Sequence, residues 1–288
     1  MLAVYRHTLK HYTGQILGWG IALGLLCAYG LLLYDTLVDP TVQQQYMQLI
    51  SSYPPELMTF FGDMNQMFTP DGFLNTIFFS YIPIVIGIFS IFTGASLLVG
   101  DEEKGILDLV LAHPISRTKL FISRLGAFIT ATTLILIISW LGFVVTLPKT
   151  SLQTTLWELL LPFLSLLSLL IFFGTLTLLL SMLLPSLQVA AMTSGLILVT
   201  SYFLTSLARL SEKLRPIERF FPMHYYQGGL ALTNINWGWF GLLVGLSILF
   251  AVLALMLFER RDIRVSGESG WRVSAFLRRK PTNPIGSD

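Results

Sequence analysis

The chain has 288 residues, of which 54% are hydrophobic and only 12% are charged, with a net charge of +2. Soluble proteins have about 25% charged residues, so this composition excludes a soluble enzyme, a disordered chain and a nucleic-acid-binding protein that relies on a basic patch. A single cysteine excludes a disulfide framework and a cysteine-based metal site. We therefore expect a multi-pass protein of the cell (inner or cytoplasmic) membrane.

Long stretches without Asp, Glu, Lys or Arg predict the membrane-spanning helices. These stretches are 11–34, 72–100, 125–148, 159–208 and 220–258. A helix needs about 20 apolar residues to cross the hydrocarbon layer, so the fourth stretch fits two helices. The break is predicted at Leu184-Pro185-Ser186, because proline ends a helix and serine caps the next one. The sequence therefore predicts an all-α membrane protein with six transmembrane helices in one domain, 1–264. The predicted spans are about 15–34, 76–99, 125–147, 159–184, 187–208 and 237–258.

The Lys and Arg residues predict the orientation of the helices. If both termini lie in the cytoplasm, the inner segments hold thirteen of these residues and the outer segments five. Basic residues favour the cytoplasmic side, so we expect an N-in, C-in topology. The tail 265–288 is expected to be disordered in the cytoplasm. The exception to the charge rule is the basic cluster at 209–219, which we assign to an amphipathic helix over 209–221, kinked at Pro216 in the outer interface.

Two other segments outside the spans have an amphipathic pattern. In 46–53 the apolar residues recur at helical spacing, which favours a helix on the outer leaflet over a lid above the transport path. In 101–112 three acidic residues stand where a helix N-terminus favours negative charge, and Pro114 and Ser116 then end this helix and cap the next. Its apolar stripe consists of Ile106, Leu109 and Val110. Such a stripe could lie on the inner leaflet or bind in a groove of a soluble partner.

The stretch from Glu102 to Arg117 resembles the cytoplasmic signature of ABC-2 type permeases, EExxGxLxxLLxxP[IV]SR. The six-span layout and the segment RFFPMHYYQGG (219–229) are also similar to this family. The resemblance is greatest to the branch that includes the bacitracin-export and nitrous-oxide-reductase-maturation permeases. His113 and the Ile-Leu-Asp at 106–108 depart from the usual pattern. The residues that match the signature are Glu102, Glu103, Gly105, Leu107, Leu109, Leu111, Pro114, Ile115, Ser116 and Arg117.

The resemblance implies that this chain is the permease subunit of an ABC exporter. The 101–112 helix would be the coupling helix that binds a separate ABC ATPase subunit, present in two copies per complex. ATP and Mg would bind to that ATPase, because this chain has no GxxxxGK[ST] phosphate loop. The permease would form a homodimer, or a heterodimer with a second permease. Its 5–12 helix would lie on the lipid headgroups. The implied ATPase-coupling residues are Glu102, Glu103, Gly105, Ile106, Leu109, Val110, Pro114 and Arg117.

The spans contain no ionisable residue except at their ends, which disfavours an ion-coupled transporter and an intramembrane hydrolase. Hydroxyl and aromatic side chains suit a hydrophobic or amphipathic cargo, such as a drug, lipid or peptide-like compound. A non-transporting membrane anchor or assembly factor is the alternative. We expect no catalytic residue, no cofactor in this chain and no nucleic-acid partner. The candidate pathway residues are Ser80, Thr93, Ser194, Thr200, Ser201 and Thr205. Tyr81 and Tyr202 belong to the same candidate pathway. The candidate gate residues are Phe220, Phe221, Tyr225 and Tyr226.

Three further patterns have a structural interpretation. The pair His7 and His11 could hold a metal, but the neighbouring Arg6 and Lys10 would repel a cation. Met58, Met64 and Met67 lack a His or Cys beside them, and Met223-His224 is expected to be structural. Closely spaced glycines favour packing inside the bundle over a dimer seam. These glycines are Gly14, Gly18, Gly20 and Gly24, and Gly241 and Gly245.

Overall fold

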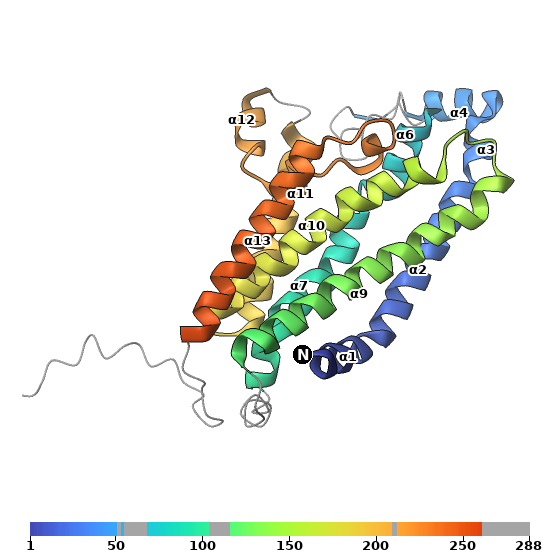
Figure 1. Ribbon diagram of the computed structural model, residues 1–288. Helices are drawn as coiled ribbons and strands as arrows, with labels where there is room; N and C mark the ends of the chain where they lie inside the picture. Colours follow the sequence, from blue (N-terminus) through green and yellow to red (C-terminus); the bar gives the residue numbers. More distant parts are fainter. Residues whose placement is uncertain (51–52, 55–67, 104–115, 209–211, 261–288) are drawn as a thin grey trace, which may run out of the picture.

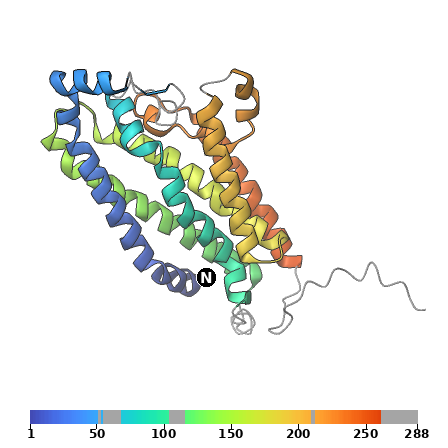
Figure 2. The same cartoon turned by 180° about the vertical axis from the view of Figure 1, so that it is seen from behind.

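The computed structural model shows a bundle of helices (Figures 1 and 2). The residues that it describes are 1–50, 53–54, 68–103, 116–208 and 212–260. All regular structure in these ranges is helical. Six helices there are long and apolar enough to cross a membrane, which confirms the predicted number of spans. They are α2 (Thr13–Leu32), α7 (Ile82–Glu103), α9 (Arg117–Thr146), α10 (Leu156–Leu183), α11 (Leu187–Ala208) and α13 (Trp237–Arg260).

Shorter helices connect these six. At the N-terminus α1 (Leu2–His11) precedes α2, in the place of the predicted 5–12 helix, with its charged side chains exposed. The other short elements are α3 (Tyr34–Val38), α4 (Pro40–Ile50), α6 (Pro70–Leu74), η2 (Asn75–Phe79), η3 (Leu147–Lys149), η4 (Glu212–Leu214), α12 (Arg215–Glu218), η5 (Pro222–Tyr225) and η6 (Gly228–Leu232). Asp39 begins α4 by accepting the Thr41 N–H at 2.9 Å and the Thr41 hydroxyl, and these bonds hold the pKa of the Asp39 carboxyl below its usual range.

The two ends of the bundle carry different short elements (Figures 1 and 2). One end, called here the α1 end, holds α1, the start of α9 and the end of α13. The opposite end, called the α4 end, holds α3, α4, α6 and α12. The first residue and the end of α13 therefore lie at the same end of the bundle, as an even number of spans requires.

The predicted break between the fourth and fifth spans is correct. α10 ends at Leu183, and α11 begins at Leu187. The Ser186 hydroxyl accepts the Val189 N–H at 3.3 Å and so caps α11, as the sequence suggested. Pro162 lies inside α10 without ending it, so the position of Pro185 in the chain, rather than proline alone, marks the connection.

The prediction that a new helix begins at 101 is wrong. α7 continues through Glu103, so the three acidic residues at 101–103 form its last turn. Charged residues indicate where the chain leaves the hydrocarbon layer. The helix itself can continue past that point, so the charges do not locate its end. The remaining part of the predicted coupling helix, 104–112, lies outside the described residues.

The single amphipathic helix predicted over 209–221 is also not observed. The described part of this segment forms the turn η4 and the four-residue helix α12, and Phe221 is extended, with φ −102° and ψ 139°. Pro216 lies in the first turn of α12, where proline is favoured, instead of kinking a longer helix. Pro222 forces the preceding Phe221 out of the helical region.

Glycines set two close helix crossings. A Cβ added to Gly142 of α9 would lie 2.0 Å from the Gly24 carbonyl oxygen of α2. A Cβ added to Gly94 of α7 would lie 2.2 Å from the Gly174 carbonyl oxygen of α10. Packing inside the bundle is thus correct for Gly24, and also for Gly20, which faces Ile138. The same additions at Gly14, Gly18, Gly241 and Gly245 would meet open space.

These crossings predict a large difference between two Gly→Ala variants. Gly142→Ala should lower the free energy of unfolding by about 1–3 kcal/mol, because α2 and α9 must separate to admit the methyl group. Gly241→Ala is the matched control, since its methyl group meets open space on α13 and alanine favours the helix. Thermal unfolding of the purified protein in detergent compares the two. Equal melting temperatures would contradict the close α2–α9 crossing.

An aromatic cluster packs between η2, α9 and α10 near the α4 end. Phe78 and Phe79 of η2 pack against Phe143 of α9 and Phe163 of α10, with ring centroids 4.9 to 6.3 Å apart. η2 is a single π-helical turn, in which the Ser80 N–H donates to the Asn75 carbonyl at 2.7 Å. Such turns are rare in proteins, and those that occur are often at functional sites. Here the turn carries Asn75 and Phe79 to the site described next.

Candidate functional site

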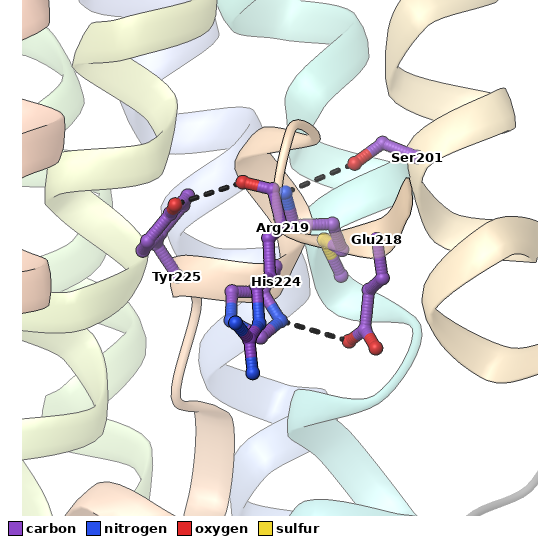
Figure 3. Close-up of polar contacts among 6 residues, drawn as sticks. Ser201, Glu218, Arg219, His224 and Tyr225 are labelled. Atoms are coloured by element: carbon purple, nitrogen blue, oxygen red, sulfur yellow. Dashed lines mark hydrogen bonds and ion pairs between the residues drawn. The ribbon is translucent and has the colours of Figure 1, made fainter. Parts of the chain in front are cut away.

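The segment 222–236 folds into the α4 end of the bundle between α11 and α13. Its irregular backbone is tied to three different elements. The Met223 N–H donates to the Ser201 hydroxyl of α11 at 2.9 Å (Figure 3). The Gln227 N–H donates to the Ser165 hydroxyl of α10 at 3.0 Å, and the Gly229 N–H donates to the Asn75 side-chain oxygen at 3.1 Å. Met223, Gln227 and Gly229 are buried, and buried backbone N–H groups require such internal partners.

Two glycines let this segment approach η2 closely. Gly228 has φ +54°, and a Cβ there would lie 2.6 Å from the Asn75 side-chain oxygen. A Cβ on Gly229 would lie 2.6 Å from the Asn75 backbone nitrogen. Only glycine fits both positions without moving η2. The Gly-Gly pair of the RFFPMHYYQGG motif is therefore required by the contact with η2.

Gln227 and Asn236 connect the segment to the start of α13. The Gln227 amide nitrogen donates to the Asn236 carbonyl at 3.1 Å, and the Asn236 N–H donates to the Gln227 side-chain oxygen at 2.5 Å. The Asn236 side-chain oxygen then accepts the N–H groups of Gly238 and Trp239, at 3.0 and 3.2 Å, and caps α13. We call this pair the Gln227–Asn236 clip.

An aromatic group covers the other side of the segment. The His224 ring lies 5.0 Å from the Tyr225 ring and 5.2 Å from the Trp239 ring of α13. His224 Nδ1 is 3.0 Å from Glu218 Oε1, and the Tyr225 hydroxyl donates to the Arg219 carbonyl at 2.8 Å (Figure 3). These contacts hold α12 and the first turn of α13 against η5.

A small pocket lies between α11, η2 and the segment. Its volume is about 70 Å³, whereas a pocket for a drug-sized ligand has about 300–1,000 Å³. The pocket itself is therefore too small for a drug-sized cargo. The Thr205 hydroxyl is buried there without a hydrogen-bond partner among the described residues. The lining residues are Asn75, Phe79, Ser80, Tyr202, Thr205, Ser206, Met223, Tyr226, Gln227, Gly228 and Leu230.

The structure brings some of the predicted pathway and gate residues together. Tyr202 and Tyr226 line the pocket, and the Tyr226 hydroxyl donates to the Phe79 carbonyl at 3.0 Å. Tyr225 packs on Trp239 and Phe221 is half-buried just before the segment, whereas the Phe220 side chain is exposed. Tyr81 is not among the lining residues, and its hydroxyl donates to the Ile77 carbonyl one turn earlier.

The predicted pathway residues have different surroundings. Ser80 and Thr205 line the pocket, whereas Ser201 holds the Met223 N–H. Thr93 of α7 and Ser194 of α11 are buried but do not line the pocket, and Thr200 is exposed on α11. The sequence assigned no role to four residues that hold the segment, because the bonds that they form join groups 9 to 154 residues apart, a separation that no short motif covers. These residues are Asn75, Ser165, Gln227 and Asn236.

At the α1 end, the predicted coupling residues separate into two groups. Glu102 and Glu103 belong to the last turn of α7. Arg117 begins α9, and its guanidinium donates to the carbonyls of Phe258 and Glu259 in α13, at 3.2 and 3.3 Å. The other predicted coupling residues lie outside the described residues. They are Gly105, Ile106, Leu109, Val110 and Pro114.

The described residues contain no group of three His, Cys, Asp or Glu side chains placed to hold a metal. His7 and His11 are exposed on α1, and His224 is paired with Glu218. Met58, Met64 and Met67 lie outside the described residues.

One comparison with known proteins identifies a relationship. The sequence profile of the ABC-2 family transporter proteins matches residues 17–263. The match covers the six long helices, the segment 222–236 and the predicted coupling stretch. No curated protein matches the chain.

Proposed function

Because this chain belongs to the ABC-2 family of transporter proteins, we propose that it is the permease of an ATP-driven exporter of hydrophobic or amphipathic compounds. The observation that carries the proposal is the family match across all six spanning helices. Permeases of this family generally work with an ABC ATPase. The exporter would contain two ATPase subunits and two permeases, either identical or different, with ATP and Mg bound by the ATPase.

The interior of the bundle supports an apolar or amphipathic cargo. Among the described residues, Arg124 is the charged side chain that the bundle buries, and it lies near the α1 end, where it donates to the Leu97 carbonyl at 2.8 Å. The other buried polar side chains are hydroxyls and the Gln227 amide. Ion-coupled transport requires ionisable groups in the spans, so an external energy source suits this interior better.

The pocket supports a gate at the α4 end. The 222–236 segment lines a pocket there of about 70 Å³, which is too small for a drug-sized cargo. A cargo that leaves through this end must first displace the segment from η2 and α11. The closed pocket is then the resting state, and ATP binding in the partner supplies the free energy for opening.

Purification with a candidate ATPase tests the proposal. We expect a stable complex whose vanadate-sensitive ATP hydrolysis rises with one class of compound in a panel of lipids, drugs and peptides. Vesicles without the permease are the control for each compound. A chain that binds no ATPase, and whose presence changes no hydrolysis rate, would instead be a membrane anchor or assembly factor.

A cysteine pair tests the proposed N-in, C-in orientation. In a Cys27→Ser background, Gln44→Cys should react with an impermeant maleimide in intact cells, because Gln44 is exposed on α4 and the proposed orientation puts α4 outside. Ser269→Cys, which lies outside the described residues, should react only after lysis. Cys27 is buried in α2. It is the single cysteine of the sequence, so the Cys27→Ser replacement removes background labelling. Labelling of both cysteines from the same side would contradict the orientation.

A further inference from the structure

The last spanning helix, α13, is held at both ends by directional hydrogen bonds. At the α1 end, Arg117 of α9 donates to the carbonyls of Phe258 and Glu259. The Thr118 hydroxyl donates to the Glu259 carboxylate at 2.7 Å. The ring of Phe121, one turn further along α9, lies 6.4 Å from the ring of Phe258. We call this group the α9–α13 clamp.

The clamp joins the start of one span to the end of another. The last carbonyls of a helix have no partner within the helix and carry partial negative charge, so a guanidinium there is favourable. Arg117 is also the first residue of α9, and it is the last of the residues that the family resemblance implies for ATPase coupling. A shift of the predicted coupling stretch would therefore pull on α13 as well as on α9.

At the α4 end, the same helix is joined to the 222–236 segment. The Gln227–Asn236 clip fixes the first turn of α13 through two hydrogen bonds. Trp239, in that turn, lies against the rings of His224 and Tyr225. Motion of α13 along its axis would therefore move the segment that closes the pocket.

Between its two ends, α13 is a continuous helix. It has 24 residues, which correspond to about 36 Å at 1.5 Å per residue. Along this length it packs mainly on α10, and much of its remaining surface is exposed, including Ile248, Leu249 and Met256. A straight helix with one packed face can slide or tilt as a unit.

We propose that α13 transmits motion from the ATPase-binding end to the 222–236 segment, with Arg117 as the positioning residue that engages it. This inference rests on the proposed function, because it requires an ATPase at the α1 end. In this proposal, the pocket opens because motion of α13 displaces the 222–236 segment. The competing route runs through α7, since η2 precedes α7 in the chain and holds Gly229 through Asn75.

The test uses the complete permease–ATPase complex in nanodiscs, with a reporter cysteine on the segment. Leu230→Cys in the Cys27→Ser background reports on the pocket, because Leu230 lines it and is half exposed. Gln44→Cys on α4 is the reporter control. In the parent protein, we expect ATP and vanadate to change the maleimide labelling rate of Leu230→Cys severalfold and that of Gln44→Cys little.

Variants of the clamp decide between the two routes. Arg117→Ala and Thr118→Val should each reduce the nucleotide response of Leu230→Cys, and together they should abolish it, compared at equal amounts of bound ATPase. Arg117→Lys keeps a cation near the helix end and should restore part of the response. Lys119→Ala is the matched control, because Lys119 is an exposed basic residue on the same turn of α9, and it should respond as the parent does.

The outcomes separate this inference from the proposed function. A full response of Leu230→Cys in the double clamp variant would overturn transmission through α13 and favour the α7 route. A parent protein that binds no ATPase would contradict the proposed function itself, and transmission through α13 with it. A fall in melting temperature without a change in the labelling ratio would show that the clamp only stabilises the fold, which also overturns the inference.

Discussion

Replacement of Leu109 by aspartate should release the ATPase from the membrane while the permease remains inserted and folded. Leu109 belongs to the apolar stripe of the coupling stretch, together with Ile106 and Val110. A carboxylate in a desolvated groove costs several kcal/mol unless it is paired. A loss of about 4 kcal/mol corresponds to roughly a 1,000-fold weaker complex, so co-purification of the ATPase with Leu109→Asp should fall below detection.

A neighbouring substitution provides the control for this result. Asp108→Asn changes a charge at the next position, which is not part of the apolar stripe, and it should leave ATPase binding intact. Leu109 lies outside the described residues, so the prediction rests on the spacing of the apolar residues and on the family match that includes this stretch. ATPase that co-purifies undiminished with Leu109→Asp would exclude the stripe as the docking surface.

The spanning helices could be predicted from the sequence because charge is excluded from the hydrocarbon layer. The gaps between charged residues therefore located all six helices, and Pro185 located the connection inside the longest gap. The same reasoning failed at the helix ends. α9 begins at Arg117 and α7 ends at Glu103, both beyond the gaps, since a helix can continue into water after its apolar part has ended.

The site was only partly predictable. Aromatic residues in an apolar segment suggested Tyr202 and Tyr226, and both line the pocket. The polar residues that position the segment gave no pattern of their own. Ser165 holds the backbone N–H of Gln227, 62 residues away, and Asn75 holds that of Gly229, 154 residues away. Such pairs depend on how the helices pack, which neither composition nor spacing specifies.

The error over 209–221 has a similar cause. Leu214, Ile217 and Phe221 recur at helical spacing, which favoured one amphipathic helix. Proline fixes φ and lacks an N–H, so Pro216 and Pro222 divide the segment into short turns. The described part of 209–221 instead packs on α11 and is tied to η5, where Glu218 Oε1 lies 3.0 Å from His224 Nδ1 and the Arg219 carbonyl accepts the Tyr225 hydroxyl. These contacts with the rest of the fold outweigh the local periodicity.

The side chains of Phe221 and Tyr225 at the α4 end should control the rate of ATP hydrolysis if they are part of the gate. The Tyr225 ring lies 6.0 Å from Trp239 of α13, and the Phe221 N–H donates to the Glu218 carbonyl at 2.9 Å. Replacing a fully buried Phe by Ala costs about 3–5 kcal/mol of stability. Because the Phe221 and Tyr225 rings are each half-buried, the two replacements together should cost a similar amount of packing free energy. That loss would loosen the closed state more than the open state.

We therefore expect Phe221→Ala combined with Tyr225→Ala to raise basal ATP hydrolysis severalfold and to weaken its stimulation by cargo. Hydrolysis would then no longer require cargo to displace the segment, because the closed state that restrains the ATPase would be less stable. Phe220→Ala is the matched control. The sequence grouped Phe220 with the gate, but its side chain is 87% exposed in the structure, so little packing is lost and both rates should stay at the parent values. Both rates are measured on the complex in nanodiscs with the stimulating compound identified from the panel. If the double variant assembles normally and keeps both parent rates, the aromatic group is a passive part of the membrane surface, and the gate must be formed by the pocket residues around Tyr226 and Gln227 instead.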